Sequence, residues 1–140
     1  MSTIKQQIRE NIIAIISLIV AIAALYHNER LYELSERNRN IRLAAFEVLM
    51  HLGELQQVVN SIHYNDQSLP NAIMLGWGHV ALIGDLSTLI PAPVPKAVQE
   101  LILAWKQYND QIKEESAADA ISDHINQTRE AILKAILQLG

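Results

Sequence analysis

The fold is decided by residues 12–26, IIAIISLIVAIAALY, an apolar run that only Ser17 interrupts. The flanking positions extend it, so residues 11–28 hold no charged side chain when His27 is neutral. A helix from Arg9 to Arg30 would rise about 31 Å at 1.5 Å per residue, close to the ~30 Å hydrocarbon thickness of a bilayer. The sequence therefore predicts a membrane anchor within residues 1–28 of a single-pass protein.

Two other interpretations of this run stay open. Lys5 and Arg9, the apolar run and Ala21-Ile22-Ala23 together have the form of a cleavable signal peptide. The run could also be a buried helix of a soluble protein. An uncleaved anchor is favoured because no Pro or Gly breaks the run and the helical pattern continues beyond it.

Four arginines follow the run within one short stretch and form a membrane-proximal basic cluster: Arg30, Arg37, Arg39 and Arg42. The N-terminal flank offers only Lys5, Arg9 and the terminal amine. Because Lys and Arg concentrate on the cytoplasmic side of short flanks, this asymmetry favours an outside N-terminus and a cytoplasmic C-terminal domain. The expected location is the inner (cell) membrane.

The rest of the chain is acidic. From Glu47 onward five basic residues stand against eleven acidic ones, which argues against nucleic-acid binding because that needs a basic surface. The absence of cysteine excludes disulfides and thiolate-bound metals. Residues 29–140 are long enough for one modest hydrophobic core.

A helical seam follows the anchor. Steps of three and four residues join ten positions, nine of them apolar: Leu31, Leu34, Asn38, Ile41, Ala45, Val48, Leu52, Leu55, Val59 and Ile62. Such spacing is typical of a helix packed along one face. With no Pro before position 70, we expect one helix from about Ile4 to His63, ended by the turn-forming residues 64–70. Its residues 29–42 would be a juxtamembrane stalk.

Three further helices are expected. The second runs from Pro70 or Asn71 to Ile90 and is apolar nearly all round, which predicts burial. A stiff connector, residues 91–95 (PAPVP), precedes the third, for which Pro95 is a suitable first residue. Ser116 and Asp119 resemble a capping box that opens the fourth. The predicted fold is all-α, a transmembrane helix continuing into a four-helix bundle, with residues 71–90 as a possible second membrane insertion.

One face of the first helix is a candidate oligomer seam. It comprises Ser17, Ala21, Ala24, Leu31, Leu34, Asn38 and Ile41. Small residues four apart let membrane helices approach closely, and a buried Asn sets register in two-stranded coils. Pairing along this face predicts a homo-oligomer; otherwise residues 31–40 are an exposed stalk.

No catalytic, cofactor or metal site is predicted. The five histidines are scattered, and although Glu47, His51 and Glu54 share a helix face, the paired Glu-x-x-His motifs of bundle metal sites are absent. The nucleophile motif G-x-S-x-G and a phosphate-binding loop are also absent. Asp85 is the one carboxylate in apolar surroundings, and we interpret it as a surface group.

The layout resembles small bacterial inner-membrane proteins with one N-terminal span and a helical tail, a likeness of architecture that implies no activity. The expected role is a non-enzymatic scaffold or adaptor, whose expected partners are the lipid bilayer, a second copy of itself and another protein. The alternatives are a membrane-perturbing or pore-type protein and a non-catalytic subunit of a membrane enzyme complex.

Overall fold

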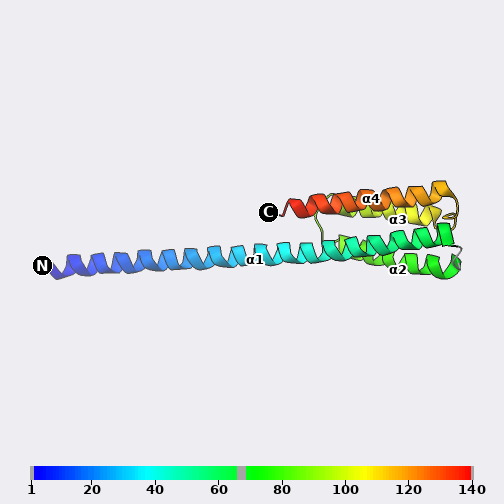
Figure 1. Cartoon of the computed structure of the whole chain (residues 1–140). Coiled ribbons are helices and arrows are strands. Elements are labelled where there is room, and N and C mark those ends of the chain that lie inside the picture. The colour runs from blue at the N-terminus through cyan, green and yellow to red at the C-terminus, as the bar shows by residue number, and fades with distance from the viewer. Residues whose placement is uncertain (1, 66–68, 140) are drawn as a thin grey trace. The chain divides into compact units, whose positions relative to one another are not determined.

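The computed structural model describes residues 2–65 and 69–139, which form four α-helices and no strand. In chain order these are α1 (Ser2–Asn65), α2 (Leu69–Ser87), α3 (Val94–Tyr108) and α4 (Glu115–Leu137), as Figure 1 shows. The predicted all-α class with four helices is confirmed. The predicted turn at 64–70 lies partly outside the described residues; its described ends are the last residues of α1 and the first of α2.

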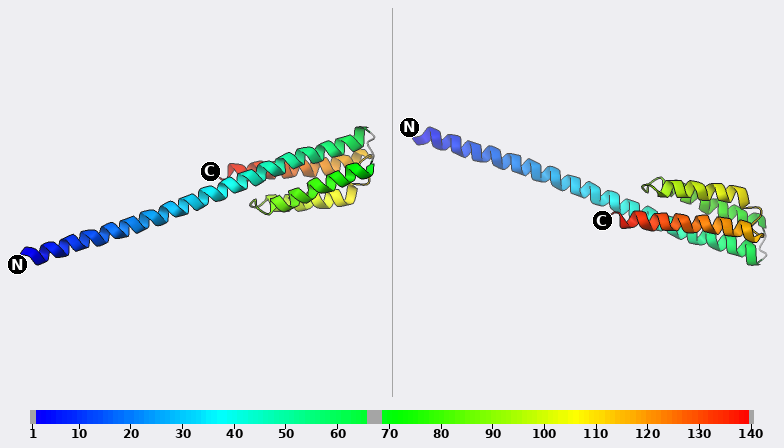
Figure 2. Two further views of the ribbon diagram at one scale, coloured as in Figure 1. Left: turned by 90° about the horizontal axis from the view of Figure 1, so that it is seen from below. Right: turned by 90° about the horizontal axis from the view of Figure 1, so that it is seen from above.

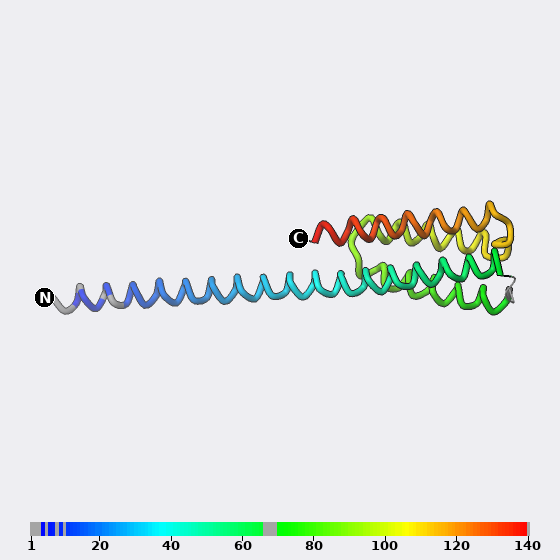
Figure 3. The backbone as a smooth tube through the Cα atoms, in the orientation of Figure 1, coloured from blue at the N-terminus to red at the C-terminus, as the bar shows by residue number. Residues whose placement is uncertain are grey.

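Helix α1 is continuous, as expected from the lack of proline before position 70. Figure 3 shows its path without a break. It nevertheless belongs to two compact units, which meet between Asn38 and Arg39. We call residues up to Asn38 the N-terminal unit and residues 39–140 the C-terminal unit.

The N-terminal unit is a single stretch of helix. It contains the one segment of the described chain that is long and apolar enough to cross a membrane, and none of that apolar segment is buried. Every side chain from Asn11 to Ser35 is exposed. A core helix of a soluble protein would instead bury much of this surface.

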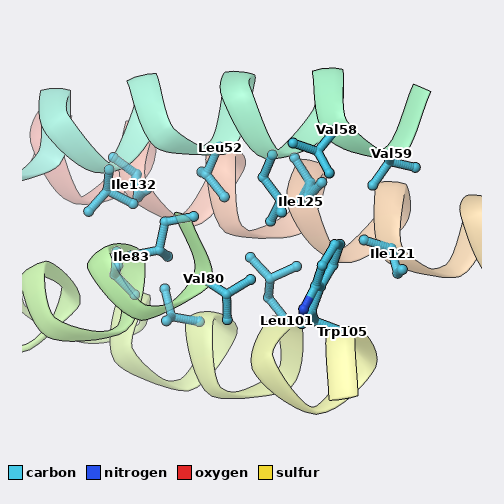
Figure 4. Close-up of a cluster of buried hydrophobic side chains, with 14 of the residues drawn as sticks. Leu52, Val58, Val59, Val80, Ile83, Leu101, Trp105, Ile121, Ile125 and Ile132 are labelled. Atoms are coloured by element: carbon cyan, nitrogen blue, oxygen red, sulfur yellow. The ribbon is translucent and has the colours of Figure 1, made fainter. Parts of the chain in front are cut away.

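The C-terminal unit has its own hydrophobic core, to which all four helices contribute (Figure 4). The second half of α1 lies beside the other helices in the views of Figures 1 and 2. It buries every predicted seam position from 41 onward: Ile41, Ala45, Val48, Leu52, Leu55, Val59 and Ile62. This part of the seam therefore packs within the chain.

Helices α3 and α4 each bury one face. Val98, Leu101 and Trp105 of α3 lie in the core, followed by Ile112 in the next connection. From α4 come Ala118, Ile121, Ile125, Thr128, Ile132 and Ala135. The predicted capping box is wrong, because α4 begins at Glu115 after Glu114, which makes no side-chain cap bond, and Ser116 lies inside the helix.

Helix α2 differs most from expectation. It ends at Ser87 rather than Ile90, and it is not buried all round. Ala72, Val80 and Ile83 face the core, whereas the opposite side leaves apolar side chains exposed: Met74, Leu75 and Leu82. The prediction that α2 is buried all round is therefore wrong: one face of the helix is buried and the other is exposed, although both are apolar.

Gly76 explains how α2 is seated. It is buried, and a Cβ at this position would overlap Cζ2 and Cη2 of Trp105 on α3. The indole ring of Trp105 also meets Trp77 edge-on, with 6.3 Å between ring centroids. Only glycine allows the α2 backbone to approach the Trp105 ring this closely.

Polar contacts join α1 to the α3–α4 side of the unit. The Gln56 amide donates to the Ser122 hydroxyl at 2.9 Å. Nδ1 of His63 donates to the carbonyl of Ile112, also at 2.9 Å. These bonds fix the last turns of α1 against α4 and the preceding connection.

Candidate functional site

The first candidate is the apolar anchor segment, residues 11–28. Its large apolar side chains are exposed on every side of the helix: Ile12, Ile13, Ile15, Ile16, Leu18, Ile19, Val20, Ile22, Leu25 and Tyr26. Soluble proteins rarely expose a contiguous apolar surface of this extent. The segment therefore needs an apolar environment that the described chain does not provide.

The candidate oligomer seam is divided between different surroundings. Ser17, Ala21 and Ala24 are exposed on the anchor segment, and Leu31 and Leu34 are exposed beyond it. Two members differ: Asn38 is half-buried, and Ile41 belongs to the core of the C-terminal unit. A surface available for pairing thus extends no further than residues 17–34.

The basic cluster is divided between the two units. Arg30 and Arg37 belong to the N-terminal unit and are exposed. Glu29 and Glu33 line the same shallow groove as these two arginines. Arg39 and the half-buried Arg42 belong to the C-terminal unit. Acidic neighbours reduce the local positive charge, which suits a topology signal better than selective lipid binding.

A fourth candidate lies between α1 and α2 of the C-terminal unit. Nδ1 of His51 stands 3.0 Å from Oε2 of Glu54 and 3.2 Å from Nδ1 of His79. The third side of this triangle, from His79 Nδ1 to Glu54 Oε2, is also 3.2 Å. We call these three residues the His51–Glu54–His79 cluster. It is the only group of three metal-ligating side chains found among the described residues.

The cluster is half-buried and reachable from solvent. The side chains of His51 and His79 are 16% and 14% exposed, whereas that of Glu54 is 45% exposed. Glu54 and His79 also line a groove of about 510 Å³ between the two helices. Two imidazoles are therefore held by packing, and an accessible carboxylate completes the triangle.

This grouping differs from the one considered in the sequence. Glu47, the suggested third member of a face with His51 and Glu54, is exposed and takes no part. The partner is His79, which sequence reasoning missed because it lies on another helix. Asp85, the other carboxylate singled out, is exposed at the surface of α2.

Comparison with known proteins adds no assignment. No protein-family model, curated protein or solved structure matches this chain. The functional argument consequently uses only the residues and geometry described above.

Proposed function

We propose that this protein is a single-pass, membrane-anchored four-helix bundle that acts as a non-catalytic scaffold or adaptor. The observation that carries the proposal is the contrast between the two units. Apolar side chains of the C-terminal unit close over a core of their own, whereas no apolar side chain of the anchor segment is buried. The C-terminal unit is built as a folded domain, and the N-terminal unit is built as a membrane tether.

The amino-acid composition of the anchor segment makes its insertion into a membrane energetically favourable. Each Leu, Ile or Val near the centre of a span contributes about −0.3 to −0.6 kcal/mol to insertion, while a single Arg or Lys there costs about 2.5–3.5 kcal/mol. The segment has many of the former and none of the latter. Arg9 and Arg30 stand at its two ends, where long basic side chains reach the interface.

Accessibility of single cysteines tests the crossing and its direction. The natural chain has no cysteine, so Gln7→Cys, Ser17→Cys and Ser116→Cys each introduce one thiol. Gln7 precedes the anchor segment in the sequence and Ser116 follows it, and both residues are exposed. With a membrane-impermeant maleimide, we expect Gln7→Cys to react in intact cells, Ser116→Cys only after lysis, and Ser17→Cys in neither case. Equal labelling of Gln7→Cys and Ser116→Cys in intact cells would contradict a single crossing.

The intact mass of the membrane-extracted protein separates an anchor from a signal peptide. An uncleaved anchor leaves the mass of the full chain unchanged. Cleavage after Ala23 would remove the apolar run and release a soluble C-terminal unit. Recovery of the shortened form from the soluble fraction would refute the anchor.

Exposed apolar residues on the C-terminal unit support the interaction role. Helix α1 has three exposed apolar side chains on successive turns: Leu43, Phe46 and Met50. Helix α2 exposes the apolar face described above. Apolar surface outside a closed core marks candidate sites for another protein. Co-purification of a catalytic protein with the full chain would specify the role as that of a subunit of an enzyme complex.

A pore-type function is a second candidate, because α2 has an exposed apolar face that could insert into a membrane. Insertion of α2 would, however, withdraw Val80 and Ile83 from the core and separate Gly76 from Trp105. Because those contacts stabilise the unit, a scaffold is the better-supported function. Leakage of a dye from liposomes on addition of the protein would favour the second candidate.

Self-association through the anchor segment is a further part of the proposal. Ser17 and Ala21 are four residues apart and leave a shallow surface for a second helix. Ala21→Ile should therefore reduce cross-linked dimer in membranes, whereas Ile22→Leu, on another face, should not. Identical cross-linking of both variants would exclude this face.

A further inference from the structure

We propose that the His51–Glu54–His79 cluster is a binding site for a divalent transition-metal ion of the zinc class. The three ligand atoms come from two consecutive helices, α1 and α2, and lie 3.0–3.2 Å from one another. This site is independent of the membrane anchor, because all three residues belong to the C-terminal unit.

The triangle has the size that a tetrahedral ion requires. Ligands about 2.0–2.1 Å from zinc at tetrahedral angles stand about 3.3 Å apart. With sides of 3.0, 3.2 and 3.2 Å, an ion about 2.05 Å from each atom would lie roughly 1 Å out of their plane, with ligand–ion–ligand angles of about 94–103°. A shift of a few tenths of an ångström, which the exposed carboxylate of Glu54 can supply, would complete the geometry.

The donor set selects the class of ion. Two imidazole nitrogens are poor ligands for Mg²⁺ and Ca²⁺, which prefer oxygen. Imidazole suits zinc, copper, nickel and iron, and two His with one carboxylate is a known zinc ligand set that leaves a fourth position open. The exposure of Glu54 and the adjoining groove let water take that position.

Both helices hold the ligands in place. His51 and Glu54 are three residues apart, so they share one face of α1. His79 reaches them from α2, whose position is set by the buried contact of Gly76 with Trp105. Because both imidazoles are largely buried, binding requires little reordering of side chains.

A purely hydrogen-bonded cluster is the competing explanation. One imidazole N–H can donate to Glu54, and two Nδ1 atoms at 3.2 Å can share a proton. Such a cluster would hold the helices together without a metal. It predicts that replacing a histidine alters stability while added metal has no effect, which separates the two explanations.

The test is a zinc titration of the metal-stripped full chain in detergent micelles. Calorimetry measures the stoichiometry and affinity of binding, and thermal unfolding measures the change in melting temperature. We expect one zinc ion per chain and a rise in melting temperature that chelator reverses, because a ligand that binds the folded state stabilises it. His51→Gln and His79→Gln should each weaken zinc binding by about tenfold or more. Cobalt substitution should give the visible spectrum of a four-coordinate ion.

Matched variants keep the result interpretable. Glu54→Gln should weaken binding, whereas Glu47→Gln, on the same helix but outside the cluster, should not. His27→Gln is the control for the histidine substitutions. His79→Cys should retain zinc, because a thiolate is also a zinc ligand. No zinc binding by the folded wild-type chain, or unchanged binding by a folded His79→Gln variant, would overturn the proposal.

Discussion

Replacement of Gly76 by alanine should destabilise the C-terminal unit, whereas the same change two residues later should stabilise it. A Cβ at Gly76 would overlap two ring atoms of Trp105, and a third, Cε2, would be 3.3 Å away. A Cβ at Gly78 would meet nothing within 4 Å. Both positions lie inside α2, so the two variants share the same gain in helix propensity.

The magnitude follows from the difference between the variants. Exchanging Gly for Ala inside a helix stabilises it by about 0.5–1 kcal/mol, and this gain applies to both positions. Forcing a methyl group into a packed core costs about 1–3 kcal/mol, and this cost applies to Gly76 alone. Gly76→Ala should therefore be less stable than Gly78→Ala by about 1–3 kcal/mol.

This difference in stability is measured by thermal unfolding of the full chain in detergent micelles, with circular dichroism as the readout. Each kcal/mol corresponds to about 4–8 °C for a domain of this size. A smaller side chain at position 105 should relieve the overlap. The double variant Gly76→Ala/Trp105→Leu should therefore lose less unfolding free energy than the sum of the two single variants. Equal melting temperatures for Gly76→Ala and Gly78→Ala would refute the close approach of α2 to Trp105.

Three other predictions test the core and the anchor segment. Leu52→Ala, in the middle of the core, should lower the free energy of unfolding by about 2–5 kcal/mol, while Leu43→Ala, exposed on the same helix, should change it by less than about 0.5 kcal/mol; urea unfolding compares them. Thr128→Val should cost about 0.5–1.5 kcal/mol in the same assay, because its buried hydroxyl donates to the His124 carbonyl at 2.8 Å. Ile19→Arg, at the centre of the anchor segment, should add about 2.5–3.5 kcal/mol to insertion and shift protein out of the membrane fraction; an unchanged fraction would argue against a span there.

Helix positions and most core faces could be predicted because their sequence patterns have a definite period. Along α1 the predicted seam positions recur every three or four residues from Ile41 to Ile62, and all of these seam positions are buried. Helix α4 shows the same spacing, with polar residues between. Where one face is apolar and the other polar, the side that meets the core follows directly from the pattern.

The orientation of α2 could not be predicted in this way. Met74 and Leu82 are as apolar as Val80 and Ile83, yet the first pair is exposed and the second buried. What selects the buried face is the fit of Gly76 to the Trp105 ring, a contact between two helices. The local sequence of α2 carries no signal for a partner that lies nearly thirty residues away.

The same difference explains why two of the three members of the His51–Glu54–His79 cluster, His51 and Glu54, could be grouped from the sequence. Glu54 lies eleven residues before Asn65, the end of α1, and His79 lies ten residues after Leu69, the start of α2. At 1.5 Å per residue, they stand about 16.5 and 15 Å from the turn of an antiparallel hairpin. The predicted ends, His63 and Pro70, are nine residues from Glu54 and His79, so the common level of the two residues could be inferred from the sequence. Their rotation could not, because a shift of one residue turns a side chain by about 100°. His79 and Gly76 are three residues apart on α2, so the contact that seats Gly76 on Trp105 also determines which way His79 faces.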